Sequence, residues 1–294
     1  MIRRLASALA ASAALSVIAG SALAQSTPAA PTTPLLASDQ WRTVAPEDLL
    51  VIDTSKGRIT VALDRRMAPA HVDRIQTLAR QNFYDGLKFH RVIAGFMAQT
   101  GDPQGTGQGG SELPDVAGEF RFRRGRDGAF QPTAGAGPGY MGYFDGVAVL
   151  TQPDAQMFVT ADMKVPANAV FCPGVAGMAR AGTPDSANSQ FFLMTGRSDV
   201  LFGQYTAFGR VLSGLETVRA LNAGSEANNG TVANPDVMTR VRLASELPVG
   251  ERPTARIMDP RSPTFVARVN AARTGPALTF DPCTVEVPAE VTGG

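Results

Sequence analysis

The sequence predicts a mainly β fold that also contains two α-helices. Its 294 residues include 30 glycines and 21 prolines, which supply turns and interrupt helices, so many short strands are favoured over a helical bundle. Hydrophobic residues make up 44% of the chain, enough to form a substantial core. Strand and helix patterns do not alternate along the chain, which argues against a doubly wound parallel sheet.

The first 24 residues have the pattern of a secretory signal peptide. Arg3 and Arg4 precede an apolar run over residues 5–23, and the last small residues fit cleavage after Ala24. An uncleaved membrane anchor is the alternative. No cysteine lies near the cleavage point, so a lipoprotein is not expected. We therefore expect a periplasmic or secreted protein with no stable membrane insertion after cleavage.

Residues 25–40 are rich in Pro, Ala and Thr and predict an extended linker. Strand patterns follow at residues 49–54 and 58–64, joined by a tight turn. A helix is expected next, with Pro69 in its first turn and one apolar face. The apolar residues at helical spacing are Val72, Ile75, Leu78 and Ala79. Further strands are expected at 191–195, 207–211 and 237–244, and a second helix at 214–222.

Residues 89–103 read FHRVIAGFMAQTGDP and hold the most informative motif of the chain. Side chains alternate on either side of Gly95, as in two short strands joined by a turn. Such a hairpin would present Arg91, Phe96, Met97 and Gln99 together. A guanidinium beside an apolar floor suits one task, which is to hold a neutral carbonyl while an uncharged ring packs beneath it.

A second block, residues 177–195, reads GMARAGTPDSANSQFFLMT. Both blocks resemble the active-site signatures of the cyclophilins, and the flanking segments resemble the strands and helices that frame them. The resemblance covers residues 49–247 with one large interruption. It implies a closed antiparallel β-barrel capped by an α-helix at each end, and peptidyl-prolyl cis-trans isomerase activity (EC 5.2.1.8). No cofactor or metal is implied, and the expected partners are proline-containing polypeptides.

The resemblance also assigns the site residues. Arg91 and Gln99 would hold the carbonyl and the proline nitrogen of the substrate, and an apolar pocket would take the proline ring. The residues so assigned are Arg91, Phe96 and Gln99 as catalytic, and Met97, Ala179, Arg180, Gln190, Phe192, Val200, Leu201 and Tyr205 as substrate-binding. Three positions depart from the commonest pattern of the family: Arg180 replaces asparagine, Val200 replaces tryptophan and Tyr205 replaces histidine. These changes alter the wall of the groove and leave its chemistry in place.

The domain organisation follows from this match. An isomerase domain is expected over residues 41–247, interrupted by an insertion at about 120–171 and followed by a tail, residues 248–294, that packs on the domain. The Asp145-Gly146 step predicts a β-hairpin, so the insertion is interpreted as a pair of hairpins. Its four clustered arginines would form a solvated strand face, or alternatively bind an acidic partner or an anionic membrane surface. They are Arg121, Arg123, Arg124 and Arg126.

Other kinds of site are not supported by the sequence. The glycines of residues 105–110 match G-x-G-x-x-G, but no convincing helix follows, so a dinucleotide site is not expected. His71 is predicted on a helix surface and His90 in a structural role, and neither has a second ligand at metal-binding spacing. The Ser186 and Ser189 hydroxyls have no visible base. The net charge of +1 argues against nucleic acid as a partner.

Cys172 and Cys283 are the only cysteines, and the expected export makes a disulfide between them the favoured interpretation. Cys283 would lie in a strand-like run over residues 278–287. Two buried free thiols are the alternative. For the whole chain, two functions remain open: an enzyme that isomerises prolyl bonds in exported or unfolded proteins, or a peptide-binding holdase with incidental catalysis. A monomer is expected in either case.

Overall fold

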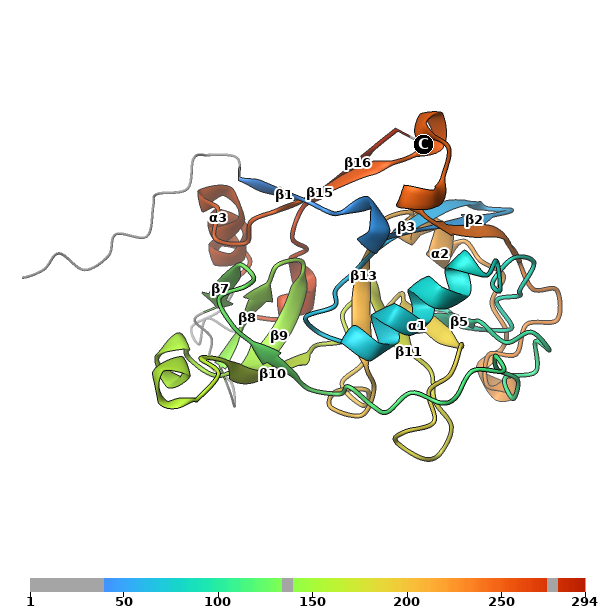
Figure 1. The fold of residues 1–294 in the computed structure, drawn as a ribbon, viewed down its shortest axis with the longest axis horizontal. Helices are drawn as coiled ribbons and strands as arrows, with labels where there is room; N and C mark the ends of the chain where they lie inside the picture. Colours follow the sequence, from blue (N-terminus) through green and yellow to red (C-terminus); the bar gives the residue numbers. More distant parts are fainter. Residues whose placement is uncertain (1–39, 134–139, 274–279, 294) are drawn as a thin grey trace, which may run out of the picture. The chain divides into compact units, whose positions relative to one another are not determined.

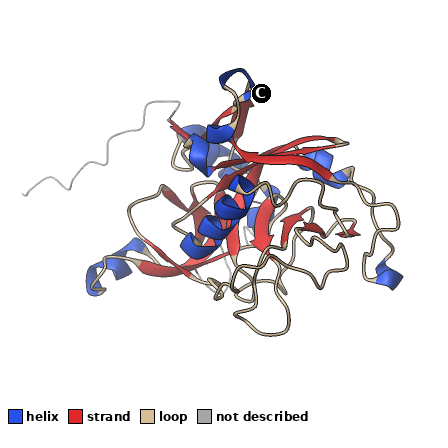
Figure 2. Cartoon of the chain, turned by 45° about the vertical axis from the view of Figure 1, so that its right-hand side comes forward, coloured by secondary structure: helices blue, strands red, loops and turns tan. Residues whose placement is uncertain are grey.

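The structure is a computed structural model that describes residues 40–133, 140–273 and 280–293. The predicted signal peptide and nearly all of the predicted linker lie outside these residues. Strands dominate and form three antiparallel sheets of eight, five and three strands (Figures 1 and 2). Over the described ranges, no helix combines the length and the apolar character needed to cross a bilayer.

The eight-stranded sheet has the strand order β14-β2-β3-β13-β11-β12-β5-β4. Its strands are β2 (Leu49–Thr54), β3 (Gly57–Leu63), β4 (Arg91–Ile93), β5 (Met97–Thr100), β11 (Val175–Met178), β12 (Phe191–Met194), β13 (Ala207–Ser213) and β14 (Met238–Leu243). Helix α1 (Pro69–Arg80) lies over this sheet (Figure 1) and buries the four apolar side chains that the periodicity predicts. Helix α2 (Leu215–Arg219) is shorter than expected, and the left-handed Gly214 precedes it.

The eight-stranded sheet is strongly curled, but its first and last strands do not pair with each other. The structure therefore matches the expected closed barrel only in part. The two edge strands are β14 and β4. The residues just before each of them are linked by an isolated bridge between Lys88 and Val237, and the Met238 amide donates to the Leu87 carbonyl at 2.9 Å. A few backbone hydrogen bonds therefore replace the continuous strand pairing that a closed barrel requires.

The insertion forms a five-stranded sheet of order β6-β10-β9-β8-β7. Its elements are β6 (Phe122–Arg124), β7 (Phe130–Thr133), β8 (Tyr140–Phe144), β9 (Val147–Thr151), the 3-10 helix η2 (Asp154–Val159) and β10 (Val165–Ala169). The predicted hairpin is present: β8 and β9 turn at Asp145, whose φ is 47°. The interpretation of the insertion as a pair of hairpins is incomplete, because β6 also pairs with β10, about forty residues later in the chain. The turn residues of the sequence do not predict that pairing.

The solvated-face interpretation of the arginine cluster is wrong for Arg124. Its side chain is 1% exposed and its guanidinium lies 3.7 Å from the centroid of the Phe130 ring. It also pairs with the Asp154 carboxylate at 2.8 Å, which compensates its burial. Arg123, by contrast, is exposed and pairs with Asp162. The cluster is thus divided between the interior and the surface of the inserted sheet.

The third sheet joins the two ends of the described chain. Strand β15 (Thr254–Met258) pairs with β1 (Trp41–Thr43) on one side and with β16 (Ala289–Thr292) on the other. Helix α3 (Pro263–Ala271) begins at Ser262, whose side chain accepts a hydrogen bond from the Phe265 amide. The side chain of Phe265 is buried and packs edge to face against the ring of Tyr143, which belongs to the insertion. The two ring centroids lie 4.9 Å apart. The tail therefore packs against the inserted sheet.

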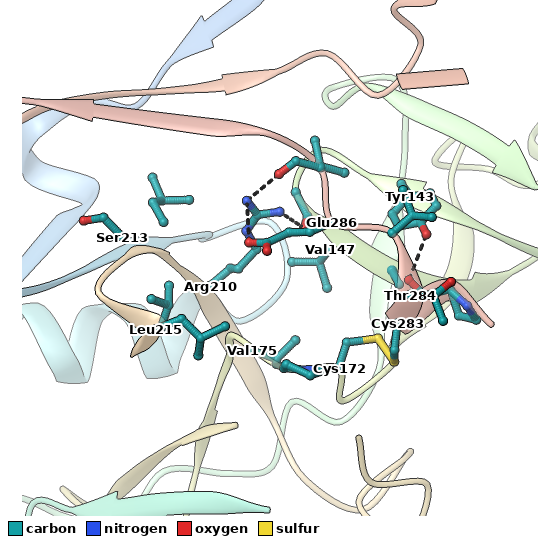
Figure 3. A pocket seen from close by; sticks show the side chains of 18 of the residues that line it. Tyr143, Val147, Cys172, Val175, Arg210, Ser213, Leu215, Cys283, Thr284 and Glu286 are labelled. Atoms are coloured by element: carbon teal, nitrogen blue, oxygen red, sulfur yellow. Dashed lines mark hydrogen bonds and ion pairs between the residues drawn. A yellow bond between two sulfur atoms is a disulfide. The ribbon is translucent and has the colours of Figure 1, made fainter. Parts of the chain in front are cut away.

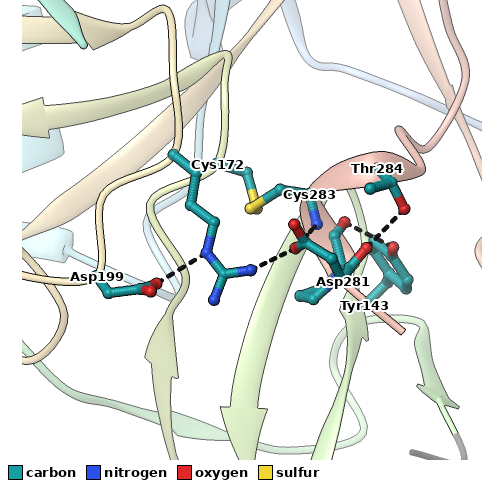
Figure 4. The surroundings of a disulfide bond; sticks show 8 residues. Tyr143, Cys172, Asp199, Asp281, Cys283 and Thr284 are labelled. Carbon is teal, nitrogen blue, oxygen red and sulfur yellow. Dashed lines mark hydrogen bonds and ion pairs between the residues drawn. A yellow bond between two sulfur atoms is a disulfide. The ribbon is translucent and has the colours of Figure 1, made fainter. Parts of the chain in front are cut away.

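The predicted disulfide is present between Cys172 and Cys283, whose Cα atoms lie 5.0 Å apart (Figure 4). Cys283 lies in a 3-10 turn (Pro282–Thr284), not in the strand-like run expected over 278–287, part of which lies outside the described residues. Next to it, Arg197 bridges the carboxylates of Asp199 and Asp281 at 2.8 and 2.6 Å.

Arg210 of β13 connects the eight-stranded sheet with the insertion and with the C-terminal tail. Its side chain is 6% exposed, and its Nη atoms donate to the Gly146 carbonyl of the insertion and the Val287 carbonyl of the tail, at 2.6 and 2.7 Å (Figure 3). The Glu286 carboxylate lies 3.6 Å away. Burial lowers the pKa of the guanidinium. The hydrogen bonds compensate much of the cost of burying this charge, so Arg210 stabilises one specific arrangement of insertion and tail.

Candidate active site

The predicted hairpin around Gly95 is present and sets the site. Strands β4 and β5 pair antiparallel, with Arg91 opposite Gln99 and Ile93 opposite Met97. Gly95 has a φ of +73°, a value that favours glycine in the connecting turn. Because Arg91 and Gln99 are directly opposed, their side chains meet on the same face of the sheet.

A chain of hydrogen bonds connects the polar side chains of the site. Arg91 Nη1 donates to Gln99 Oε1 at 3.1 Å, and Gln99 Nε2 donates to Gln190 Oε1 at 2.9 Å. Gln190 Nε2 then donates to the carbonyl of Gly109 at 2.7 Å. This chain fixes the amide orientations of both glutamines, so each has a defined donor and acceptor end. Gln99 retains a second N–H that can point into the groove.

Asn229 holds Arg91 from the other side, a contact that the sequence analysis missed. The backbone carbonyl and side-chain oxygen of Asn229 accept hydrogen bonds from Arg91 Nε and Nη2, at 2.9 and 3.0 Å. Asn229 adopts a φ of 52°, which asparagine tolerates better than most residues. Within the described ranges, no carboxylate pairs with Arg91. The guanidinium is therefore oriented by neutral oxygens, and no described carboxylate neutralises the positive charge that it presents to a ligand.

The apolar pocket lies beside this network and has a volume of about 190 Å³. Its lining residues are Arg91, Phe96, Met97, Gln99, Ala179, Arg180, Phe192, Leu201 and Tyr205. Met97, Phe192 and Leu201 are buried and form its floor. Nine of the eleven residues assigned from the sequence thus meet around one cavity. The size and the apolar floor suit a small ring such as that of proline.

The two remaining assigned residues lie elsewhere. Gln190 lines a neighbouring cavity of about 450 Å³, and its side chain is connected to the pocket by the hydrogen bond from Gln99. Val200 is 78% exposed and lines neither cavity. Its assignment to the groove wall came from the family resemblance, in which tryptophan is common at this position, whereas here the residue lies in a turn with its side chain exposed. Ala179 and Arg180 line both cavities and mark the boundary between them.

The glycine-rich loop forms one wall of the neighbouring cavity. It wraps around the carboxylate of Asp102, which is 1% exposed and accepts hydrogen bonds from the amides of Gln104, Thr106 and Gly107 at 2.6–2.8 Å. Burial alone would raise the pKa of Asp102, but these amides outweigh it and hold the pKa below its usual value. The glycines thus fold around an internal anion, which accounts for the motif without a bound phosphate.

The inserted sheet supports the floor of the pocket from behind. Phe171, at the end of the insertion, packs its ring 6.0 Å from that of Phe192, and both belong to one apolar cluster with Met97 and Leu201. The backbone carbonyl of Phe171 also accepts a hydrogen bond from the Ser198 amide at 3.0 Å. The insertion is therefore continuous with the core beneath the pocket.

The two histidines are both buried. His71 was expected on a helix surface and is instead fully buried, with its Nδ1 2.7 Å from a carboxylate oxygen of Glu119. The same carboxylate accepts the Ala70 and His71 amides and so caps α1. His90 is 6% exposed, and burial lowers its pKa. Among the described residues, no three His, Cys, Asp or Glu side chains are grouped to hold a metal ion.

Comparisons with known proteins agree with this geometry. The family described as "Cyclophilin type peptidyl-prolyl cis-trans isomerase/CLD" matches residues 49–243. A "Probable peptidyl-prolyl cis-trans isomerase" of Brucella suis biovar 1 is 34% identical over 212 residues, which cover 68% of this chain and 85% of that protein. The corresponding Brucella abortus (strain 2308) protein is 33% identical, with the same coverage. The crystal structure of the cyclophilin AquaCyp293 from Hirschia baltica has a TM-score of 0.75 and 33% identity, covering 86% of this chain and 94% of that one.

The chain belongs to the cyclophilin-type peptidyl-prolyl cis-trans isomerases. It is an enzyme that binds proline-containing peptides and rotates the bond before proline. The match with AquaCyp293 extends beyond residues 49–243, so much of the added structure around the family core is shared with that bacterial protein.

Proposed function

We propose that this isomerase catalyses folding of exported proteins outside the cytoplasm, with Arg91, Phe96 and Gln99 as its catalytic residues. Rotation about the peptide C–N bond costs about 18–20 kcal/mol because resonance gives it double-bond character. A catalyst must bind the twisted amide more tightly than either planar isomer. The hydrogen-bonded pair of Arg91 and Gln99 at the rim of the apolar pocket is the observation that carries this assignment.

Arg91 and Gln99 place hydrogen-bond donors close to the atoms of the twisted amide that become better hydrogen-bond acceptors. When resonance is lost, the proline nitrogen becomes pyramidal and gains a lone pair, which an N–H of Arg91 or Gln99 would stabilise. Arg91 donates three N–H groups to Gln99 and Asn229 and a fourth weakly to the Met97 sulfur at 3.9 Å, which leaves one for the substrate. The proline ring would rest on Met97, Phe192 and Leu201, with Phe96 at the rim. The donors are fixed before the substrate binds, so little reorganisation accompanies the twist.

The residues before the proline would lie as an extended strand along the neighbouring cavity. Ala179 and Arg180 would hold them through the backbone, and Gln190 through its side chain. No described side chain in either cavity forms a nucleophile–base pair, and bond rotation requires none. The proposed mechanism therefore involves only noncovalent contacts between enzyme and substrate.

Export is supported by the leader-like first 24 residues and by the disulfide between Cys172 and Cys283. We expect the enzyme to act as a monomer and to have no nucleic-acid partner, since its net charge is +1. Intact-mass analysis of protein from a periplasmic fraction tests this proposal. We expect a chain that begins at Gln25 and has no alkylatable thiol before reduction. A full-length chain retained in the cytoplasm would contradict export.

Refolding of a disulfide-bonded client whose slow phase is prolyl isomerisation tests the role in folding. We expect the enzyme to accelerate that phase at substoichiometric concentrations. The holdase alternative predicts suppressed aggregation with an unchanged slow phase, and it requires stoichiometric protein.

A further inference from the structure

We infer that the Arg180 side chain selects substrates with an acidic residue immediately before the proline. This inference rests on the proposed function, because it takes the 190 Å³ pocket as the proline site. The backbone role of Arg180 needs no particular side chain. Its guanidinium, however, has contacts that hold it over the groove.

Two aromatic rings hold the guanidinium in place. Its Cζ lies 4.6 Å from the centroid of the Tyr205 ring and 5.7 Å from that of Phe120. Tyr205 lines the proline pocket, whereas Phe120 is where the insertion begins. The position that most family members fill with asparagine therefore carries a cation here, and the insertion contributes one of the rings that hold it.

Backbone acceptors fix the guanidinium further. Nε donates to the Gln204 carbonyl at 3.0 Å, and Nη1 donates to the Ala181 carbonyl at 2.9 Å. The Nη2 group has no hydrogen-bond partner in the described part of the chain. No carboxylate there lies within ion-pair distance of Arg180. A half-buried, immobilised and unpaired cation is prepared to meet an anion from the substrate.

The position of Arg180 identifies the substrate residue that it contacts. A peptide with its proline in the pocket must cross into the neighbouring cavity past Ala179 and Arg180, which line both. The residue at that boundary is the one directly before the proline. Farther along, Asp115 lines the second cavity and adds negative charge. The preference for an acidic side chain is thus limited to one position.

The test compares peptides Ala-Xaa-Pro-Phe with Xaa as Glu, Gln or Lys, measured by NMR exchange without a protease. At low ionic strength we expect kcat/KM for Glu-Pro to exceed that for Lys-Pro by about 3- to 10-fold. The ratio should fall toward one in 0.5 M salt and in Arg180→Asn or Arg180→Gln. Because each ratio is internal to one variant, a general loss of activity does not affect it.

Two controls separate a local contact from the overall charge. The peptide Glu-Ala-Pro-Phe has the same charge one position away and should show no comparable gain. Arg219→Gln removes an exposed arginine that pairs with Glu216 outside both cavities, and it should leave the ratio unchanged. Equal rates for Glu-Pro and Lys-Pro in the unmodified enzyme would overturn this inference alone. Absence of isomerisation with every peptide would overturn the proposed function as well.

Discussion

The eight-stranded sheet and the inserted sheet share one apolar cluster but contribute different things to the site. The first carries Arg91, Met97, Gln99 and Phe192, which line the groove. None of the described residues of the insertion lines either cavity, yet its apolar side chains reach the back of the pocket. The residues that line the groove thus come from short local motifs. The side chains that pack behind the pocket come from the insertion, which those motifs do not predict.

If the added segments support the pocket, the largest effect should come from releasing them. The disulfide joins residues 111 positions apart, and chain entropy assigns a loop of that length about 4–5 kcal/mol. Replacing both cysteines by serine should lower the free energy of unfolding by that order, measured by urea denaturation. Reductant should destabilise the native protein similarly and leave the serine variant unaffected. Equal stability of the two proteins without reductant would contradict the account.

Phe171→Ala tests the contact between insertion and pocket directly. Truncating a buried phenylalanine costs about 3–5 kcal/mol, and the lost packing beneath Phe192 should also reduce kcat/KM. The matched control is Phe158→Ala, because Phe158 belongs to the same insertion but is 65% exposed. It should change stability by no more than about 0.5 kcal/mol and leave kcat/KM unchanged. Comparable losses of kcat/KM in both variants would mean that the insertion has no specific connection to the pocket.

The glycine-rich loop should be sensitive to acid. The Asp102 carboxylate has a lowered pKa in the folded protein, so the stability that it contributes is fully present above its unfolded pKa of about 3.9. That contribution disappears as pH falls through the lower, folded pKa. Asp102→Asn should cost about 1–3 kcal/mol at neutral pH and flatten the stability profile below about pH 4. An unchanged profile would show that the amides do not stabilise the anion.

The smallest effect is expected at Val200. Its side chain is exposed and lies outside both cavities, so Val200→Ala should leave kcat/KM for tetrapeptides within experimental error. A clear loss would show that the groove wall extends farther than the pocket.

Sequence reasoning was most successful where one segment determines its own geometry. The hairpin at Gly95 brings Arg91 opposite Gln99 by local pairing alone, and the apolar spacing of residues 69–80 is sufficient to place α1. Both predictions depend on contacts within about ten residues.

It failed where the partner is distant in the sequence. Burial of His71 depends on Glu119, and that of Arg124 depends on Phe130 and Asp154. Closure of the barrel was expected from the family resemblance, but the two edge strands of this sheet do not pair, and isolated bridges with a few backbone hydrogen bonds link the segments beside them. The contact of Asn229 with Arg91 spans 138 positions, and no motif links the two residues.

The most direct test of the central claim is the catalytic effect of Arg91, measured as kcat/KM for a proline tetrapeptide. We expect Arg91→Ala to lower it by roughly one to three orders of magnitude, because a donor aimed at the twisted amide is lost. Arg91→Lys should recover little, since an ammonium cannot reproduce the planar contacts to Gln99 and Asn229. An unchanged unfolding midpoint would show that the variants are folded. A folded Arg91→Ala enzyme with near-normal kcat/KM would contradict the assignment of this arginine and the mechanism built on it.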